Sequence, residues 1–117
     1  MSTGRSLVVE ADGGSRGNPG PAGYGAVVRD GATGQVLAER AAAIGTATNN
    51  VAEYSGLIAG LRAAAEIDPA AAVEVRMDSN LVIQQMSGAW QIRHPALIPL
   101  ARTAAELAAG FREVRYT

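Results

Sequence analysis

The chain has 117 residues, enough for one domain with one core, and its eleven acidic and ten basic residues give a net charge of −1. The absence of cysteine excludes disulfides and thiolate metal sites, and a single histidine means that any metal site would use mainly oxygen ligands. No apolar stretch reaches the ~18 to 20 residues of a membrane span, and the N-terminus lacks the apolar segment of a signal peptide, so we expect a cytoplasmic protein without a membrane partner. The near-neutral charge is atypical of nucleic-acid-binding proteins, in which a basic surface attracts phosphate.

The first half of the chain predicts three strands followed by a long helix. The strands are expected at residues 7–11, 24–29 and 36–44, and the short connections between them predict an antiparallel meander. Thr48, Asn49 and Asn50 supply capping side chains for a helix that runs to about Ile67. The Asp-Pro pair at residues 68–69 ends this helix.

The second half of the chain predicts two strands and two further helices. A strand is expected at residues 73–77, followed by a short helix at residues 80–86 that Gly88 closes. A last helix is expected to start at residues 95–96 and to end at Gly110, before a strand at residues 111–116. The order βββαβααβ indicates an α/β protein with one mixed sheet flanked by helices.

Three acidic residues lie at junctions between these elements and are the candidate catalytic and metal-binding residues. Asp12 is expected at the end of the first strand, Asp78 at the end of the fourth, and Glu53 in the first turn of the long helix. If the first and fourth strands are parallel neighbours, both aspartates emerge at one edge of the sheet, where α/β proteins commonly bind ligands. Each residue also has a purely structural interpretation: Asp12 opens a turn, Asp78-Ser79 caps a helix, and Asn50 with Glu53 forms a capping box.

Three motifs together resemble the type 1 ribonuclease H family. They are the segment 12–25 (DGGSRGNPGPAGYG), the segment 48–53 (TNNVAE) and the segment 77–79 (MDS), in the family's order and spacing. The resemblance extends over nearly the whole chain and is strongest to the N-terminal ribonuclease H domain of actinobacterial bifunctional proteins, whose C-terminal phosphatase-like domain is absent here. It implies a ribonuclease H-like fold with strand order 3-2-1-4-5, Mg²⁺ or Mn²⁺ as cofactor, and hydrolysis of the RNA strand of an RNA·DNA hybrid.

The resemblance also implies a role for each residue of the motifs. Asp12 would bridge two metal ions, with Glu53 and Asp78 each serving mainly one, in an endonucleolytic reaction that leaves 5′-phosphate and 3′-hydroxyl ends. The residues that match positions contacting the hybrid are Gly13, Gly14, Ser15, Asn18, Thr48, Asn49, Asn50 and Asn80. Asparagine suits such contacts because its side chain both donates and accepts hydrogen bonds. The alternative for Asn49 and Asn50 is that they only cap the helix.

The chain departs from the family pattern at its C-terminus. It ends at Thr117, before a mobile histidine and the terminal helix with a fourth carboxylate, so we expect residues 1–117 to form a single ribonuclease H-like domain that is truncated there. The alternative functions are a hybrid-binding module with an incomplete, weakly active or inactive metal site, and a fragment completed by another chain, with oligomers possible. His94 precedes a helix start and is expected to be structural. Trp90 either stacks on a sugar of the DNA strand or packs against the protein.

Overall fold

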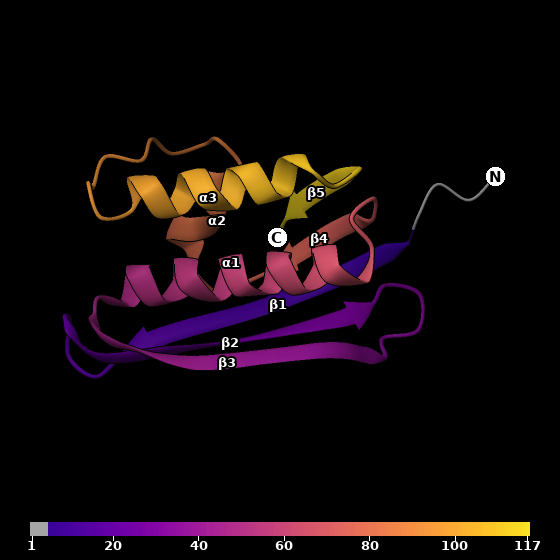
Figure 1. Cartoon of the computed structure of the whole chain (residues 1–117). Helices are drawn as coiled ribbons and strands as arrows, with labels where there is room; N and C mark the ends of the chain where they lie inside the picture. Colours follow the sequence, from indigo (N-terminus) through magenta and orange to yellow (C-terminus); the bar gives the residue numbers. More distant parts are fainter. Residues whose placement is uncertain (1–4) are drawn as a thin grey trace.

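The computed structural model describes residues 5–117, which form one five-stranded sheet and three helices (Figure 1). The strands are β1 (Ser6–Ser15), β2 (Gly20–Asp30), β3 (Val36–Ala47), β4 (Ala72–Arg76) and β5 (Glu113–Tyr116). Their order in the sheet is β3-β2-β1-β4-β5, which confirms the expected topology. The first three strands pair antiparallel, and β4 runs parallel to both β1 and β5.

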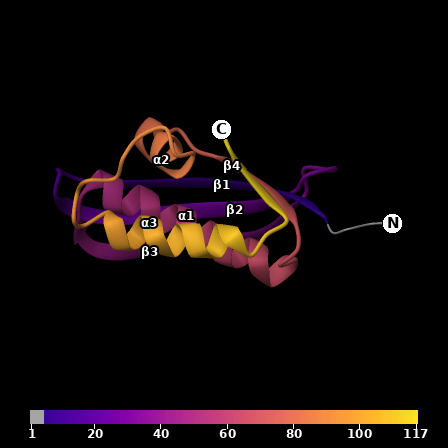
Figure 2. The same cartoon turned by 90° about the horizontal axis from the view of Figure 1, so that it is seen from above.

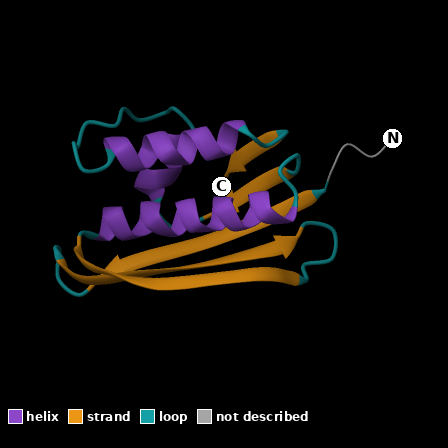
Figure 3. Ribbon diagram, viewed as in Figure 1, coloured by secondary structure: helices purple, strands orange, loops and turns teal. Residues whose placement is uncertain are grey.

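The helices α1 (Asn49–Ile67), α2 (Asn80–Met86) and α3 (Ile98–Ala109) cover one side of the sheet, as Figures 1 and 3 show. In the view from above in Figure 2, α3 lies in front of α1, both helices run roughly along the strands, and α2 lies apart from them. Thr48 starts α1 because its hydroxyl accepts a hydrogen bond from the Val51 amide at 3.3 Å. The helix ends at Asp68, in agreement with the expected Asp-Pro stop.

The core lies between the sheet and α1 and consists of small aliphatic side chains with few aromatic ones. Leu7 and Val9 of β1 are fully buried against Leu57 and Leu61 of α1. This close packing follows from the composition, because a chain with five aromatic residues has to fill its interior with Ala, Val, Leu and Ile. No helix within residues 5–117 is long and apolar enough to cross a membrane.

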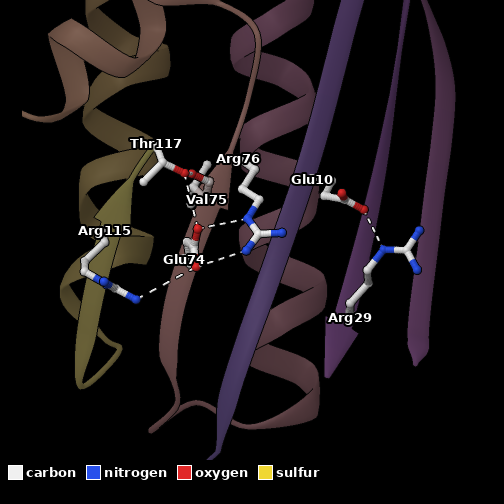
Figure 4. A network of polar contacts seen from close by, with 7 residues as sticks. All are labelled: Glu10, Arg29, Glu74, Val75, Arg76, Arg115 and Thr117. Carbon is white, nitrogen blue, oxygen red and sulfur yellow. Dashed lines mark hydrogen bonds and ion pairs between the residues drawn. The ribbon is translucent and has the colours of Figure 1, made fainter. Parts of the chain in front are cut away.

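The opposite side of the sheet carries ion pairs, which Figure 4 shows in front of the helices. Arg29 on β2 lies 2.6 Å from Glu10 on β1. Glu74 on β4 accepts from Arg76 at 2.8 Å and lies 3.8 Å from Arg115 on β5. The charges of neighbouring strands therefore neutralise one another on this surface.

The expected boundaries need corrections, and β2 and β3 are both longer than expected, at Gly20–Asp30 and Val36–Ala47. The glycine-rich segment after Asp12 is strand and not loop, because Gly13, Gly14 and Ser15 pair with residues 22–24 of β2, so the hairpin starts later than expected. β4 has the expected length but is shifted by one residue, to residues 72–76, and β5 is shorter than expected, at residues 113–116. α3 begins at Ile98, because the residues after Pro95 form a turn and Pro99 occupies the first helical turn.

Candidate active site

Asp12 lies within β1, three residues before its end. Its partner across the β1–β2 ladder is Gly25, whereas the pairing of β1 with β4 stops at Glu10 and Arg76. Asp12 was expected at the end of the first strand. This is wrong for the pairing of β1 with β2, which continues to Ser15, but Asp12 does lie beyond the last residue of β1 that pairs with β4. The side chain is exposed, and its Oδ1 accepts from the Gly13 amide at 2.9 Å.

Gly13 brings α1 into direct backbone contact with β1. A Cβ atom at this position would overlap the carbonyl group of Ala52 and lie 2.6 Å from the amide nitrogen of Glu53. A Cβ atom on Gly56, one turn further along α1, would lie 2.8 Å from the carbonyl oxygen of Asp12. Glycine is required at both positions, and the close approach places Glu53 beside the residue that follows Asp12.

Glu53 lies just beyond the first turn of α1. Its side chain is partly buried, and Asp12 and Ser79 are its polar neighbours. Burial raises its pKa above the ordinary value of 4.5, and the negative charge of Asp12 raises it further, while a hydrogen bond from Ser79 acts in the opposite direction. The capping-box interpretation of Glu53 is wrong, because Thr48 and not Asn50 is the N-cap. The pKa of Glu53 is thus affected by the charge of Asp12 and by the nearby hydroxyl of Ser79.

Asp78 follows β4 after a single intervening residue, Met77. It is exposed, and the next residue, Ser79, is buried and caps α2 by accepting from the Val82 amide at 3.3 Å. Asp78 and Asp12 line the same cleft of about 910 Å³, which also borders β2 and β3. β1 and β4 are parallel neighbours, as the prediction required, and both aspartates border this cleft.

The three acids have the donor chemistry of a site for a hard divalent cation, since all their ligand atoms are carboxylate oxygens. No arginine or histidine of residues 5–117 forms an ion pair with Asp12, Glu53 or Asp78, whereas Glu10 and Glu74 are both paired with arginines. The side chains as they stand do not form a three-ligand group in the described part of the chain. One carboxylate oxygen of Asp12 accepts from the Gly13 amide.

Three of the predicted substrate-contacting residues form one hydrogen-bond network between the β1–β2 hairpin and the start of α1. Ser15 donates to Asn49 Oδ1 from its amide at 2.7 Å, and its hydroxyl, which donates to the Gly17 carbonyl, lies 3.1 Å from the same Asn49 oxygen. The Asn49 amide donates to Asn18 Oδ1 at 3.1 Å. Because both asparagine carbonyl oxygens bind protein groups, their Nδ2 groups are the parts that remain for a ligand.

The other predicted contact residues are spread over neighbouring elements. Gly14 is exposed beside Asn49, Asn50 is half-buried in the first turn of α1, and Thr48 is engaged as the cap. Asn80 lies apart from them at the start of α2, where its Oδ1 accepts from Gln84 at 3.3 Å. His94 has the expected structural role, since its Nδ1 accepts from the Ala96 amide at 3.1 Å before α3.

Two features near the site were not apparent in the sequence. Ser79 is expected from the sequence only as a cap, and its proximity to Glu53 depends on how α1 lies against the start of α2, which no local pattern records. The Tyr54 hydroxyl donates to Gln85 Oε1 at 2.7 Å, which ties α1 to α2. The sequence held one indication of this bond: Tyr54 lies among apolar residues at helical spacing, and a buried tyrosine hydroxyl needs a hydrogen-bond partner.

Comparisons with known proteins place the chain in a family. A model of a reverse transcriptase-like family matches residues 10–117. The bifunctional protein Rv2228c of Mycobacterium tuberculosis is 58% identical over 110 residues, which are 94% of this chain and 30% of that protein. The structure of its N-terminal RNase H domain, fused to maltose-binding protein, superposes with a TM-score of 0.93 at 57% identity, over 97% of this chain and 81% of that one.

Two further solved structures are similar over most of their length. RNase H1 of Halobacterium salinarum has a TM-score of 0.89 at 45% identity, covering 96% of this chain and 83% of that one. LC11-RNase H1, solved in complex with an RNA/DNA hybrid, has a TM-score of 0.88 at 37% identity and covers 95% and 83%. The chain belongs to the reverse transcriptase-like family, and within it to the ribonuclease H domains. It spans about a third of the length of the curated mycobacterial relative.

Proposed function

We propose that this chain is a ribonuclease H that hydrolyses the RNA strand of RNA·DNA hybrids endonucleolytically. The observation that carries the proposal is the meeting of Asp12 and Asp78 in one cleft with Glu53 beside them, with no basic residue paired to any of the three in residues 5–117. The hybrid in the crystal structure of LC11-RNase H1 supports the choice of substrate.

Asp12, Glu53 and Asp78 would hold Mg²⁺ or Mn²⁺, and a pair of such ions supplies activation of a water and stabilisation of the departing 3′ oxygen. Asp12 has the central position, since it shares a cleft with Asp78 and its charge acts on Glu53. Attack of the water on phosphorus would break the bond between phosphorus and the 3′ oxygen, so that the 3′ oxygen takes a proton and becomes a 3′-hydroxyl while the phosphate stays on the 5′ side. None of the three carboxylates needs to form a covalent bond with the substrate.

The network of Ser15, Asn18 and Asn49 would bind the minor groove of the hybrid. The Nδ2 groups of the two asparagines offer donors to sugar and base acceptors, and a 2′-hydroxyl is such an acceptor only on the RNA strand. Gly14 leaves the backbone of β1 accessible beside this network. Thr48, Asn50 and Asn80 complete the proposed contacts from the starts of the two helices.

A module that binds hybrids without cutting them is the second candidate, because no three acidic or histidine side chains of residues 5–117 are grouped as metal ligands as they stand. One labelled hybrid, tested for binding and for cleavage in Mg²⁺, in Mn²⁺ and in EDTA, separates the two functions. We expect binding under all three conditions and cleavage only with a metal. Binding without cleavage in either metal would leave the binding module as the function.

A further inference from the structure

The arginines of this chain divide into two groups according to their partners. Within residues 5–117, five of the ten form ion pairs with carboxylates: Arg5, Arg29, Arg40, Arg76 and Arg115. The other five form none: Arg16, Arg62, Arg93, Arg102 and Arg112. A protein with a net charge of −1 has little general attraction for a polyanion, so the arginines of the second group, whose charge no carboxylate neutralises, are the strongest candidates for phosphate contacts.

Arg16 is the member of that group that stands beside the proposed substrate contacts. It is exposed at the end of the β1–β2 hairpin and directly follows Ser15, whose amide donates to Asn49 Oδ1. With Gly14, Ser15 and three residues of β2, it lines a shallow hollow of about 450 Å³. Arg16 therefore lies next to groups that we propose to touch the sugars of the hybrid.

The backbone that carries Arg16 is held rigidly. The Arg16 amide donates to the Pro21 carbonyl at 2.8 Å, and a Cβ atom on Gly20 would overlap the Arg16 carbonyl oxygen. Asn18 is fixed by its hydrogen bond with the Asn49 amide. A guanidinium on a rigid hairpin loses less conformational entropy on binding than one on a mobile loop.

We propose that Arg16 binds a phosphate of the sugar–phosphate backbone of the RNA·DNA hybrid. This inference rests on the proposed function, because it takes the hybrid as the ligand. The planar guanidinium forms two parallel hydrogen bonds with phosphate oxygens, which a neutral side chain cannot replace. The contact supplies affinity and register on the hybrid, while the neighbouring asparagines read its sugars and bases.

Arg62 offers a matched control on the same protein. It is exposed on α1 and forms no ion pair in the described residues, but it lies thirteen residues beyond Asn49, which is roughly 20 Å along the helix. Arg16→Gln and Arg62→Gln change the net charge by the same amount. A difference between them therefore reports position and not total charge.

The test measures the binding of a fluorescent hybrid in EDTA, so that no strand is cut, over a series of salt concentrations from about 50 to 200 mM. For Arg16→Gln we expect about fivefold weaker binding at the lowest salt, and a slope of log affinity against log salt that is smaller by roughly 0.7 to 0.9. Arg62→Gln should keep the parental slope. Arg16→Lys should keep the slope and bind more weakly than the parent, because it retains the charge without the planar fork.

A parental slope in Arg16→Gln, or an equal loss of slope in Arg62→Gln, would overturn the inference. Cleavage of the same hybrid in Mg²⁺ is measured separately. If the parent binds the hybrid without cutting it and only Arg16→Gln loses slope, the proposed hydrolase function fails while the phosphate contact stands. A parent that does not bind the hybrid at any of these salt concentrations would overturn both.

Discussion

At the scale of single residues, Glu53 has an electrostatic environment that disfavours its charged form. Its carboxylate is partly buried next to the charge of Asp12, and both effects raise its pKa, while only a hydroxyl from Ser79 favours the charged form. A structural carboxylate is usually balanced by a basic partner, as Glu74 is by Arg76. The unbalanced environment of Glu53 fits a residue whose counter-charge is a bound cation.

The raised pKa of Glu53 predicts a pH-dependent effect of Glu53→Gln on stability. With a folded-state pKa above 4.5, the contribution of this carboxyl to stability is fully present below the unfolded pKa and is lost as the pH rises through the folded one. In EDTA, Glu53→Gln should therefore increase the free energy of unfolding at about pH 7 and change it little at about pH 4.

Urea unfolding followed by circular dichroism checks this effect, with Glu106→Gln on the exposed surface of α3 as the control. Glu106→Gln should not show the same pH-dependent gain. A Glu53→Gln variant that is less stable than the parent at neutral pH would contradict the account of this residue.

At the scale of elements, the contact between β1 and α1 depends on Gly13. Gly13→Ala should lower the free energy of unfolding by about 2 to 4 kcal/mol, because the new Cβ meets the backbone of Ala52 and backbone cannot move aside cheaply. Gly14→Ala is the matched control, since a Cβ there meets only the Asn49 side chain, at 3.9 Å. Equal stabilities of the two variants in chemical denaturation would rule out the close approach.

The hydrogen bond between Tyr54 and Gln85 is the second element-scale contact with a measurable effect. α2 has seven residues, of which Val82 is the buried one, so it depends on its neighbours for order. Burial raises the pKa of Tyr54 to about 12, which keeps the hydroxyl protonated as a donor throughout the neutral range. Tyr54→Phe should lower the free energy of unfolding by about 1 kcal/mol.

A double-mutant cycle of Tyr54→Phe with Gln85→Met tests whether this bond causes the loss. The two substitutions should couple by about 1 kcal/mol, because the second has no hydrogen bond left to remove. Additive effects would show that the hydroxyl stabilises the fold in some other way.

Strand order and most helix bounds follow from sequence pattern, and the failures have local physical causes. The segment after Asp12 contains glycines that are typical of turns, yet it is strand, because β2 supplies the partners for Gly13 to Ser15. The start of α3 was misplaced because Pro95 and Pro99 both fit a first helical turn.

The three candidate acids could be predicted because each lies next to a recognisable strand or helix. The match of three motifs to one family then indicated that the three belong to one site. Their side-chain arrangement could not be predicted. The hydrogen bond from the Gly13 amide to Asp12, and the contact of Glu53 with Ser79, depend on packing between α1, β1 and the start of α2.

For the whole molecule, a metal site made of Asp12, Glu53 and Asp78 predicts that a divalent metal ion stabilises the folded state. Mg²⁺ that binds the three acids of the native state favours that state by mass action, by about 1.4 kcal/mol at ten times the dissociation constant. Thermal unfolding should therefore shift upward with Mg²⁺ in the parent, and less in Asp12→Asn. Sodium chloride of equal ionic strength is the control, and equal shifts in both proteins would place the binding of Mg²⁺ elsewhere.

The central claim is that these carboxylates form the metal site of a ribonuclease H, and single-turnover cleavage of a hybrid with a labelled RNA strand tests it most directly. In saturating Mg²⁺ the parent should cut the RNA strand, and Asp12→Asn should retain the fold and lose about three powers of ten or more in rate. Cleavage by the parent should stop in EDTA. An Asp12→Asn protein that cuts at the parental rate, or a parent that cuts equally well in EDTA, would contradict the claim.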